Sequence, residues 1–413
     1  MNVALVIAFV GALVFMSHLF TGIFRRTRVP DVLLLTVIGL IIGPGLKIVS
    51  SEDFGRVGPV FTTVALIVML FEGGIGIHLH DLRRSLRGAT NLTVAAFLAS
   101  MATATICAVE WMHLGVIESL MFGSIVAGTA SAVVIPLARD LHIQKETKSM
   151  LVLESALTDV LCIVVMLGIL NAYESGTVNA LPVIGGILLA FLPSVVVGTV
   201  AGIAWSYLLS WAREIHNSIF MTPAFVFVVY GLAELAAMSG AIAALAFGVT
   251  LGNIELFKLG WLTKKLPSDP ICLVDKEKNF FADAVFLIKT FFFVYIGLSI
   301  RFDNLEHTAI GALIAGVIFV VRYPVVWLIS PKSMPPRDAT LVSTMAPRGL
   351  AAATLASIPL QAGVEGGEMI QNVVYSFVLA SILMNALLVL LVEKTAFGKL
   401  LDWPFRSHIR PQT

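Results

Sequence analysis

The chain has 413 residues, of which 58% are hydrophobic and only 13% are charged, and its mean hydropathy is +0.94. Apolar runs of roughly 20 residues, the length of a membrane-spanning helix, recur to the end of the chain. This composition excludes an ordinary soluble domain, and the runs are continuous where a transmembrane β-barrel would alternate. A net charge of +1 without a basic block gives no indication of nucleic-acid binding.

The apolar runs predict an all-α polytopic membrane protein with about 13 spans. In chain order these lie near 2–24, 31–46, 57–79, 89–110, 115–138, 149–170, 180–210, 218–237, 239–252, 279–300, 307–330, 338–360 and 370–393. The first run has neither a basic segment before it nor a small-residue cleavage motif, so we interpret it as a retained span. The 180–210 run is long for one span and is expected to tilt or to extend beyond the bilayer.

The basic residues are distributed unevenly over the loops between these spans. Loops on one side hold 21 of them, whereas the other side holds only Lys47, Arg56 and Arg301. Because Lys and Arg concentrate in cytoplasmic loops, the pattern predicts an N-terminus outside and a cytoplasmic C-terminal tail at 394–413. We expect an integral protein of the plasma (inner) membrane of a prokaryote.

An internal repeat is visible in short glycine-rich segments. Residues 39–43 and 74–82 in spans two and three resemble 248–252 and 297–305 in spans nine and ten. Their order and spacing predict two six-span repeats, 1–170 and 218–393, joined by a linker helix at 171–217. Because the linker crosses the membrane once, the second repeat is inverted, as in many secondary transporters. The alternative is chance similarity between glycines that serve close helix packing.

The sixth span carries two carboxylates inside the membrane, Glu154 and Asp159, and Asp159 lies near the middle of the span. On a helix they fall within about 140° of arc together with Ser155 and Thr158. A carboxylate at that depth costs on the order of a few kcal/mol and is usually retained for handling an ion or a proton. Desolvation disfavours the charged form of a carboxyl group, so a proton and a cation can compete for Asp159. A structural acid paired with a base is the alternative.

Spans five and twelve contain residues that interrupt helices. The first has Gly128, Thr129 and Ser131, and the second has Pro347 and Gly349. Broken helices expose carbonyl groups and dipole ends that suit a cation and its counter-charges. We therefore expect Thr129 and Ser131, with Ser155 and Thr158, to supply neutral oxygens to Na⁺ or K⁺ bound at Asp159.

The predicted spans contain further charged residues, each with an expected role. Glu154 and Arg348 are expected to form a buried structural ion pair, with Glu154 as an ion ligand the alternative. Glu72 is expected to line the path to the site, with an acid satisfied locally beside the following glycines as the alternative. Lys289 is expected to act as a counter-charge to Asp159 or Asp283, and Arg322 to brace the second half of the protein.

These residues resemble the monovalent cation/proton antiporter superfamily, which includes the sodium/proton exchangers. The segment 154–159, Glu-Ser-Ala-Leu-Thr-Asp, is similar to the exchanger motif Glu-Ser-Leu-Leu-Asn-Asp, and the Arg348–Gly349 pair to a later Arg-Gly element. The resemblance covers essentially the whole chain. It implies a homodimer, crossed broken helices, elevator-type alternating access, and a final Asp of the motif that binds proton or cation.

Two departures from the family pattern bear on the ion. Thr158 stands where exchangers have Asn or Asp, and Thr129-Ala-Ser131 stands where they usually have Thr-Asp-Pro. Asp159 is therefore the one acid expected to titrate at the site, and exchange of one cation for one proton, which is electroneutral, is predicted. Na⁺ and K⁺ are both left open.

The sequence leaves three other functions open. A cation channel would need a continuous polar pathway, and a sensor would use the same scaffold without transport. An organic-anion transporter would use Lys289 and Arg348 as counter-charges. The Cys and His residues show no metal-like spacing, and the sequence has no nucleophile elbow or phosphate loop. No enzyme activity, no cofactor and no metal other than the monovalent cation at Asp159 is therefore predicted.

Overall fold

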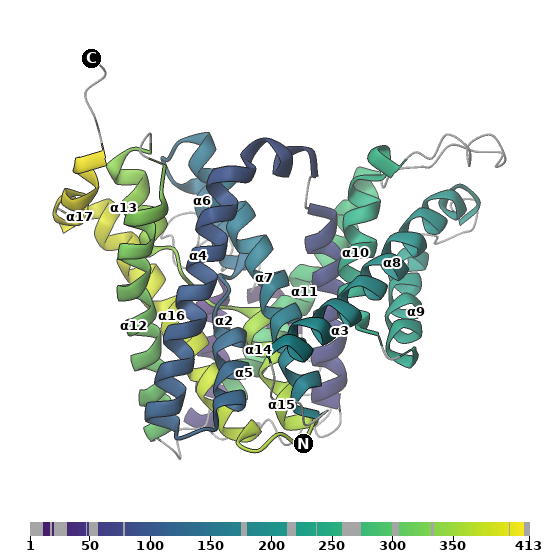
Figure 1. Ribbon diagram of the computed structural model, residues 1–413, viewed down its shortest axis with the longest axis horizontal. Helices are drawn as coiled ribbons and strands as arrows, with labels where there is room; N and C mark the ends of the chain where they lie inside the picture. Colours follow the sequence, from purple (N-terminus) through teal and green to yellow (C-terminus); the bar gives the residue numbers. More distant parts are fainter. Residues whose placement is uncertain are drawn as a thin grey trace. The chain divides into compact units, whose positions relative to one another are not determined.

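The computed structural model describes residues 11–16, 19, 31–46, 48, 57–76, 79–174, 180–212, 220–236, 238–257, 274–299, 305–331, 334–395 and 397–408. Within these ranges the chain forms helices and no strand, and 13 of the helices have seven or more residues (Figure 1). In chain order they are α2 (Asp31–Leu40), the π-helical turn η1 (Ile41–Gly45), α3 (Val57–Gly76), α4 (Leu79–Met112), α5 (Val116–Val126), α6 (Ser131–Asp140), α7 (Lys145–Glu174), α8 (Ala180–Ala212), α9 (Met221–Leu235), α10 (Gly240–Gly252), η4 (Ile254–Phe257), α11 (Asp275–Ser299), α12 (Leu305–Ile329), α13 (Pro336–Thr344), α14 (Leu350–Leu355), α15 (Ser357–Gln361), α16 (Gly367–Lys394), α17 (Phe397–Leu401) and η5 (Trp403–His408).

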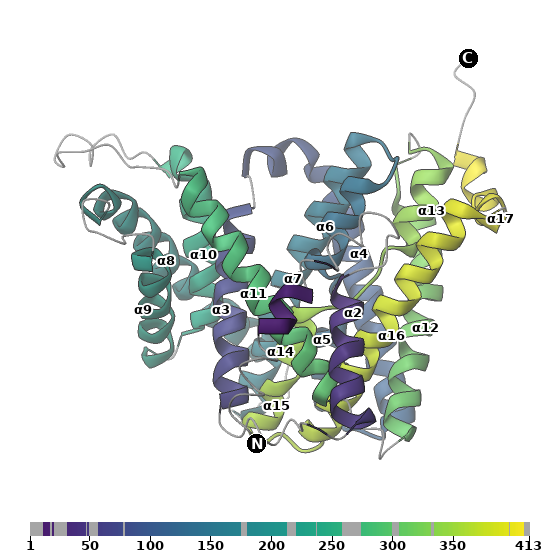
Figure 2. The same ribbon diagram turned by 180° about the vertical axis from the view of Figure 1, so that it is seen from behind.

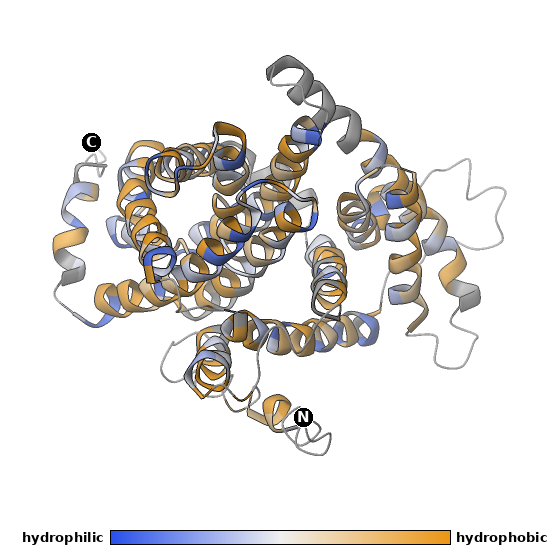
Figure 3. Ribbon diagram, turned by 90° about the horizontal axis from the view of Figure 1, so that it is seen from below, coloured by the Kyte–Doolittle hydropathy of each residue, from blue (hydrophilic) through white to orange (hydrophobic). Residues whose placement is uncertain are grey.

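The helices coincide with the predicted spans from the second to the thirteenth, and most of the first, 2–24, lies outside the described residues. Six described segments are long and apolar enough to cross a membrane, and the apolar colour dominates the ribbon in Figure 3. These six are Asn91–Met112, Lys145–Glu174, Leu192–Leu209, Asn279–Leu298, Leu305–Ile329 and Gly367–Lys394. The all-α membrane fold predicted from the sequence is thereby confirmed.

Both predicted helix breaks are present. The fifth span divides into α5 and α6 around residues 127–130, and the twelfth into α13 and α14 around residues 345–349. The two breaks meet, because the Ala130 N–H donates to the Pro347 carbonyl at 2.8 Å. This bond between extended segments satisfies backbone groups that their own helices leave unpaired.

The chain divides into two compact units. The first comprises residues 1–58, 85–162 and 289–413, and the second comprises 59–84 and 163–288. Each unit contains residues from both predicted repeats, so a repeat is not a compact unit by itself. The repeat boundaries 1–170, 171–217 and 218–393 remain predictions.

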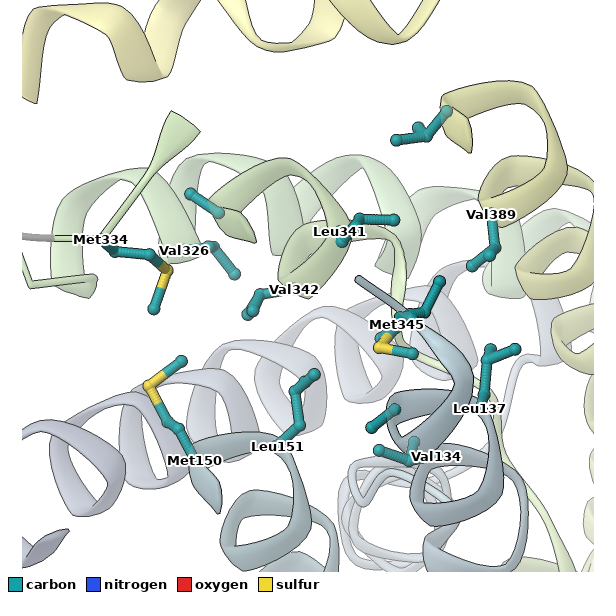
Figure 4. Packing of buried hydrophobic residues seen from close by; sticks show 14 of the residues in the cluster. Val134, Leu137, Met150, Leu151, Val326, Met334, Leu341, Val342, Met345 and Val389 are labelled. Carbon is teal, nitrogen blue, oxygen red and sulfur yellow. The ribbon is translucent and has the colours of Figure 1, made fainter. Parts of the chain in front are cut away.

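Each unit has its own apolar core. In the first, residues of α6, α7, α12, α13 and α16 form a buried cluster in which Leu341, Val342 and Met345 face Val134 and Leu151 (Figure 4). In the second, the core joins α3, α8, α9, α10 and the first half of α11 around buried aromatic rings. The first core fixes the helices that carry the candidate site.

The glycines of the repeat make matching contacts in the two units. In the first unit α2 packs on the end of α11 (Figure 2). A Cβ at Gly39 would lie 2.1 Å from the Val294 carbonyl oxygen. In the second, α10 packs on α3, where a Cβ at Gly248 would lie 2.2 Å from the Phe71 carbonyl oxygen. When residues 39–43 are aligned with 248–252 and residues 74–82 with 297–305, Val294 corresponds to Phe71. The same backbone contact is therefore made twice, each time between helices of different repeats.

Candidate ion-binding site

The candidate site lies in the first unit, where α7 passes the break between α5 and α6. The Ser131 hydroxyl donates to Asp159 Oδ2 at 2.8 Å, which brings together two residues that the sequence predicts to act together. Ser131 is also the first residue of α6, so the positive end of that helix faces the carboxylate. Asp159 is partly buried, whereas Thr158 next to it is almost fully buried.

Two side chains of α7 hold the extended segment in place. The Thr129 N–H donates to Thr158 Oγ1 at 3.0 Å, and the two threonine hydroxyls lie 3.2 Å apart. One residue earlier, the Gly128 N–H donates to Cys162 Sγ at 3.0 Å. A Cβ at Gly128 would lie 2.6 Å from that sulfur and 2.9 Å from the Thr158 carbonyl oxygen, so the close approach requires glycine.

Cys162 is not among the residues that the sequence predicts for the site. The residue follows Thr158 by four positions and therefore lies on the same face of α7. This spacing could have predicted Cys162 at the site. A lone cysteine in an apolar helix, however, usually serves only packing.

Ser155 is used differently from its neighbours on α7. It is fully buried, and its hydroxyl donates to the Val152 carbonyl at 3.0 Å, one turn earlier in the same helix. The structure thus brings Ser131 to Asp159, and Thr129 to the adjacent Thr158. The predicted role of Ser155 as an ion ligand remains a prediction.

The predicted ion pair between Glu154 and Arg348 is wrong. Glu154 instead binds Arg322 of α12 through two hydrogen bonds, of 2.6 and 3.0 Å, and both side chains are buried. The Arg322 Nε–H also donates to the Val342 carbonyl at 3.2 Å. The bidentate geometry satisfies the carboxylate without any group from the helix breaks.

Arg348 binds the ends of the broken helices. Its guanidinium donates to the carbonyls of Val126 at 2.6 Å and Ala346 at 2.8 Å, and to Ser100 Oγ at 3.4 Å. Val126 ends α5, where the helix dipole is negative, so a cation is stabilised there. The prediction failed because these exposed carbonyls compete with Glu154 for the guanidinium, and sequence spacing does not reveal which acceptor is nearer.

Glu72 and Lys289 are the two remaining predicted site residues. Glu72 lies partly buried on α3 in the second unit, and Lys289 lies partly buried on α11, at the position where that helix enters the first unit. Both residues have interactions of their own in the structure. Their roles at the ion path and as a counter-charge remain predictions.

Asp159 has a different kind of partner from the two buried arginines and Glu154. The buried arginines Arg322 and Arg348 are hydrogen-bonded to Glu154 and to helix-end carbonyls, whereas Asp159 accepts from a neutral hydroxyl. A carboxylate with neutral oxygens around it can take a hard monovalent cation, or a proton in its place. That is the chemistry an exchange site needs.

The chain is similar to known cation/proton antiporters. Residues 11–392 match the family model described as sodium/hydrogen exchanger, transmembrane. The K⁺/H⁺ antiporter NhaP of Alkalimonas amylolytica is 24% identical over 92% of this chain, and the chain spans 65% of that protein's length. The probable Na⁺/H⁺ antiporter 2 of Methanocaldococcus jannaschii is 27% identical over 87% of the chain and 85% of its own length.

A solved structure shares the fold. The sodium proton antiporter MjNhaP1 of Methanocaldococcus jannaschii superimposes with a TM-score of 0.74 at 22% sequence identity, covering 98% of this chain and 99% of that one. The similarity therefore extends over the helices of both units.

Proposed function

This chain belongs to the sodium/hydrogen exchanger family, and from that we propose that it exchanges a monovalent cation, Na⁺ or K⁺, for protons across a membrane. Asp159 is the group that takes up the cation from one side and the proton from the other. The observation that carries the proposal is the hydrogen bond of 2.8 Å from Ser131 to Asp159 at the first helix break, with the nearby arginines engaged elsewhere. Relatives named as Na⁺/H⁺ and K⁺/H⁺ antiporters support the reaction class and leave both ions open.

The exchange cycle follows from the competition at Asp159. The deprotonated carboxylate binds the dehydrated cation with help from Ser131, Thr129 and Thr158, and protonation releases it. A single carboxylate exchanges one cation for one proton, so we propose an electroneutral cycle. We also propose alternating access of the elevator type by a homodimer in the plasma membrane of a prokaryote, with the C-terminus in the cytoplasm.

The proposal is tested in proteoliposomes that carry an imposed pH gradient and a fluorescent pH indicator. Addition of Na⁺ or K⁺ is expected to dissipate the gradient for wild-type protein, and Asp159→Asn is expected to abolish that response. Gradient dissipation by the variant at the wild-type rate would overturn the assignment of Asp159. Cation-driven current without proton movement would indicate a channel instead.

Electroneutrality has its own test. An imposed membrane potential is expected to leave the wild-type rate unchanged, because the carboxylate returns neutral with the proton and neutral with the cation. Thr158→Asp adds a second acid beside Asp159 and is expected to make the rate respond to the potential. A wild-type rate that follows the potential would contradict the one-for-one stoichiometry.

A further inference from the structure

The chain after the last span folds back onto the first unit. Residues 397–408, called the C-terminal strap below, form α17 and η5. Phe405 of the strap is fully buried in the apolar core of the first unit, and its ring meets Tyr323 of α12 edge to face, with centroids 5.1 Å apart. This aromatic anchor fixes the inner face of the strap.

Polar contacts hold the same face. The Tyr323 hydroxyl donates to the Leu401 carbonyl, and the Trp327 indole N–H donates to the Pro404 carbonyl at 3.2 Å. Arg337, at the start of α13, lies 3.7 Å from the Asp402 carboxylate. The strap is therefore docked on α12 and α13 through its backbone and its buried ring.

The outer face of the strap is apolar and exposed. Leu400 is 67% exposed and Trp403 is 72% exposed, and at the adjacent end of α12 Leu328 is 73% exposed. The strap begins three residues after α16 ends at Lys394, and α16 is long and apolar enough to span the membrane. Three residues reach no further than about 10 Å, so the strap begins within that distance of the end of α16. Tryptophan is enriched at the interface between membrane and water.

The charges around Trp403 are mainly basic. The chain there carries Lys394, Lys399, Arg406 and Arg337 against the acids Glu393 and Asp402. Asp402 is already paired with Arg337, and Lys394 is exposed at the end of α16. An apolar face on a segment rich in basic residues matches the headgroup region of a membrane that contains anionic lipid.

We propose that the outer face of the C-terminal strap binds anionic phospholipid headgroups, with Leu400 and Trp403 inserted at the surface of the leaflet where α16 ends. The proposal goes beyond cation exchange and holds whether or not the chain transports. Because Tyr323 follows Arg322 on α12, lipid contact at the strap stabilises the helix whose arginine binds Glu154.

The test places a fluorophore at position 403 of the full chain. Trp403→Cys is labelled with an environment-sensitive probe after Cys272→Ser, since Cys107 and Cys162 are buried. The protein is reconstituted in phosphatidylcholine alone and in phosphatidylcholine with phosphatidylglycerol. A spin label at headgroup depth and aqueous iodide serve as the two quenchers. Glu146→Cys, at an exposed position in the first turn of α7, is the matched control.

The label at 403 is expected to be quenched by the lipid spin label and shielded from iodide, with more shielding when phosphatidylglycerol is present. The control label is expected to remain open to iodide in both lipids. Iodide quenching at 403 equal to the control would overturn the proposal, and so would shielding that is the same in both lipids. As a second measurement, phosphatidylglycerol is expected to raise the thermal midpoint of wild-type protein but not that of Leu400→Ser/Trp403→Ser. An equal rise in both would count against the proposal.

Discussion

Asp159 differs from Glu154 and Arg348 in the kind of partner it has. Glu154 has a guanidinium, and Arg348 has carbonyls and a hydroxyl, whereas Asp159 has the hydroxyl of Ser131. Fixed ion pairs hold their charge state, and a carboxylate with neutral partners can change its own. We therefore propose that Asp159 carries the exchangeable charge, whereas Glu154 and Arg348 are structural.

The Ser131 hydroxyl is expected to contribute to cation affinity. A neutral hydrogen bond is worth about 0.5–1.5 kcal/mol, so Ser131→Ala should raise the cation concentration for half-maximal exchange by about 2–10-fold. Ser124→Ala is the matched control, because the Ser124 hydroxyl is also buried but donates to Met121 in its own helix. Equal effects of the two substitutions in the proteoliposome assay would remove Ser131 from the site.

The Glu154–Arg322 pair is expected to stabilise the fold without carrying the ion. Breaking a buried pair from one side costs about 3–5 kcal/mol, because the other charge remains buried alone. Arg322→Met should therefore lower the thermal midpoint strongly, and Glu154→Gln/Arg322→Met should recover much of it. Exchange should persist in the folded double variant. Complete loss of exchange in a stable double variant would assign Glu154 to ion handling.

The sequence predicts which residues gather around Asp159, but it does not predict the partner of every buried charge. Asp159, Ser131, Thr129 and Thr158 could be grouped from helical spacing and from the glycine-rich break, and the structure brings them together. The partner of Glu154 could not be derived, because Arg322 and Arg348 are both basic residues on later spans. Only tertiary packing decides which guanidinium faces the acid and which faces the helix ends.

The helix breaks could be predicted from the sequence. Gly128 and Pro347 predict breaks from backbone chemistry alone, and both breaks occur where these residues lie. The hydrogen bond that joins the breaks, from Ala130 to Pro347, uses backbone groups and has no signature in side-chain sequence. Helix position was therefore predictable, whereas the pairing of helices was not.

The two matched glycine contacts are expected to be equally intolerant of a methyl group. Gly39→Ala and Gly248→Ala place a Cβ 2.1 and 2.2 Å from a facing carbonyl oxygen, so the helix pairs must separate. Both variants should show a clearly lower thermal midpoint and reduced exchange. Gly73→Ala is the control, since a Cβ there meets nothing within 4 Å. A midpoint for Gly39→Ala as high as that of the control would show that the α2–α11 contact is loose.

The division of the chain into two compact units cannot be predicted from the hydrophobic periodicity of the sequence. Hydropathy predicted the spans and the membrane class, and the comparisons place the chain in an exchanger family. The two compact units, however, combine segments from both ends of the chain, and α4, α7 and α11 contribute to both. Such interleaving depends on contacts between distant segments, which local sequence does not encode.

The predicted orientation of the chain in the membrane can be tested with reporter fusions in cells. An N-terminus outside and a C-terminus in the cytoplasm follow from the 21 basic residues assigned to one side. Fusion of a cytoplasm-dependent fluorescent reporter to the C-terminus is expected to give fluorescent cells, and fusion of a periplasm-dependent phosphatase is expected to give inactive enzyme. The reverse result would invert the topology.

Proton release on cation binding tests the role of Asp159 most directly. In weakly buffered solution, addition of Na⁺ or K⁺ to the purified protein is expected to release about one proton per chain, because the cation displaces the proton from a single carboxyl group. Asp159→Asn is expected to release none. Release of protons by the variant to the wild-type extent, or cation binding by wild-type protein without any release, would contradict exchange through Asp159.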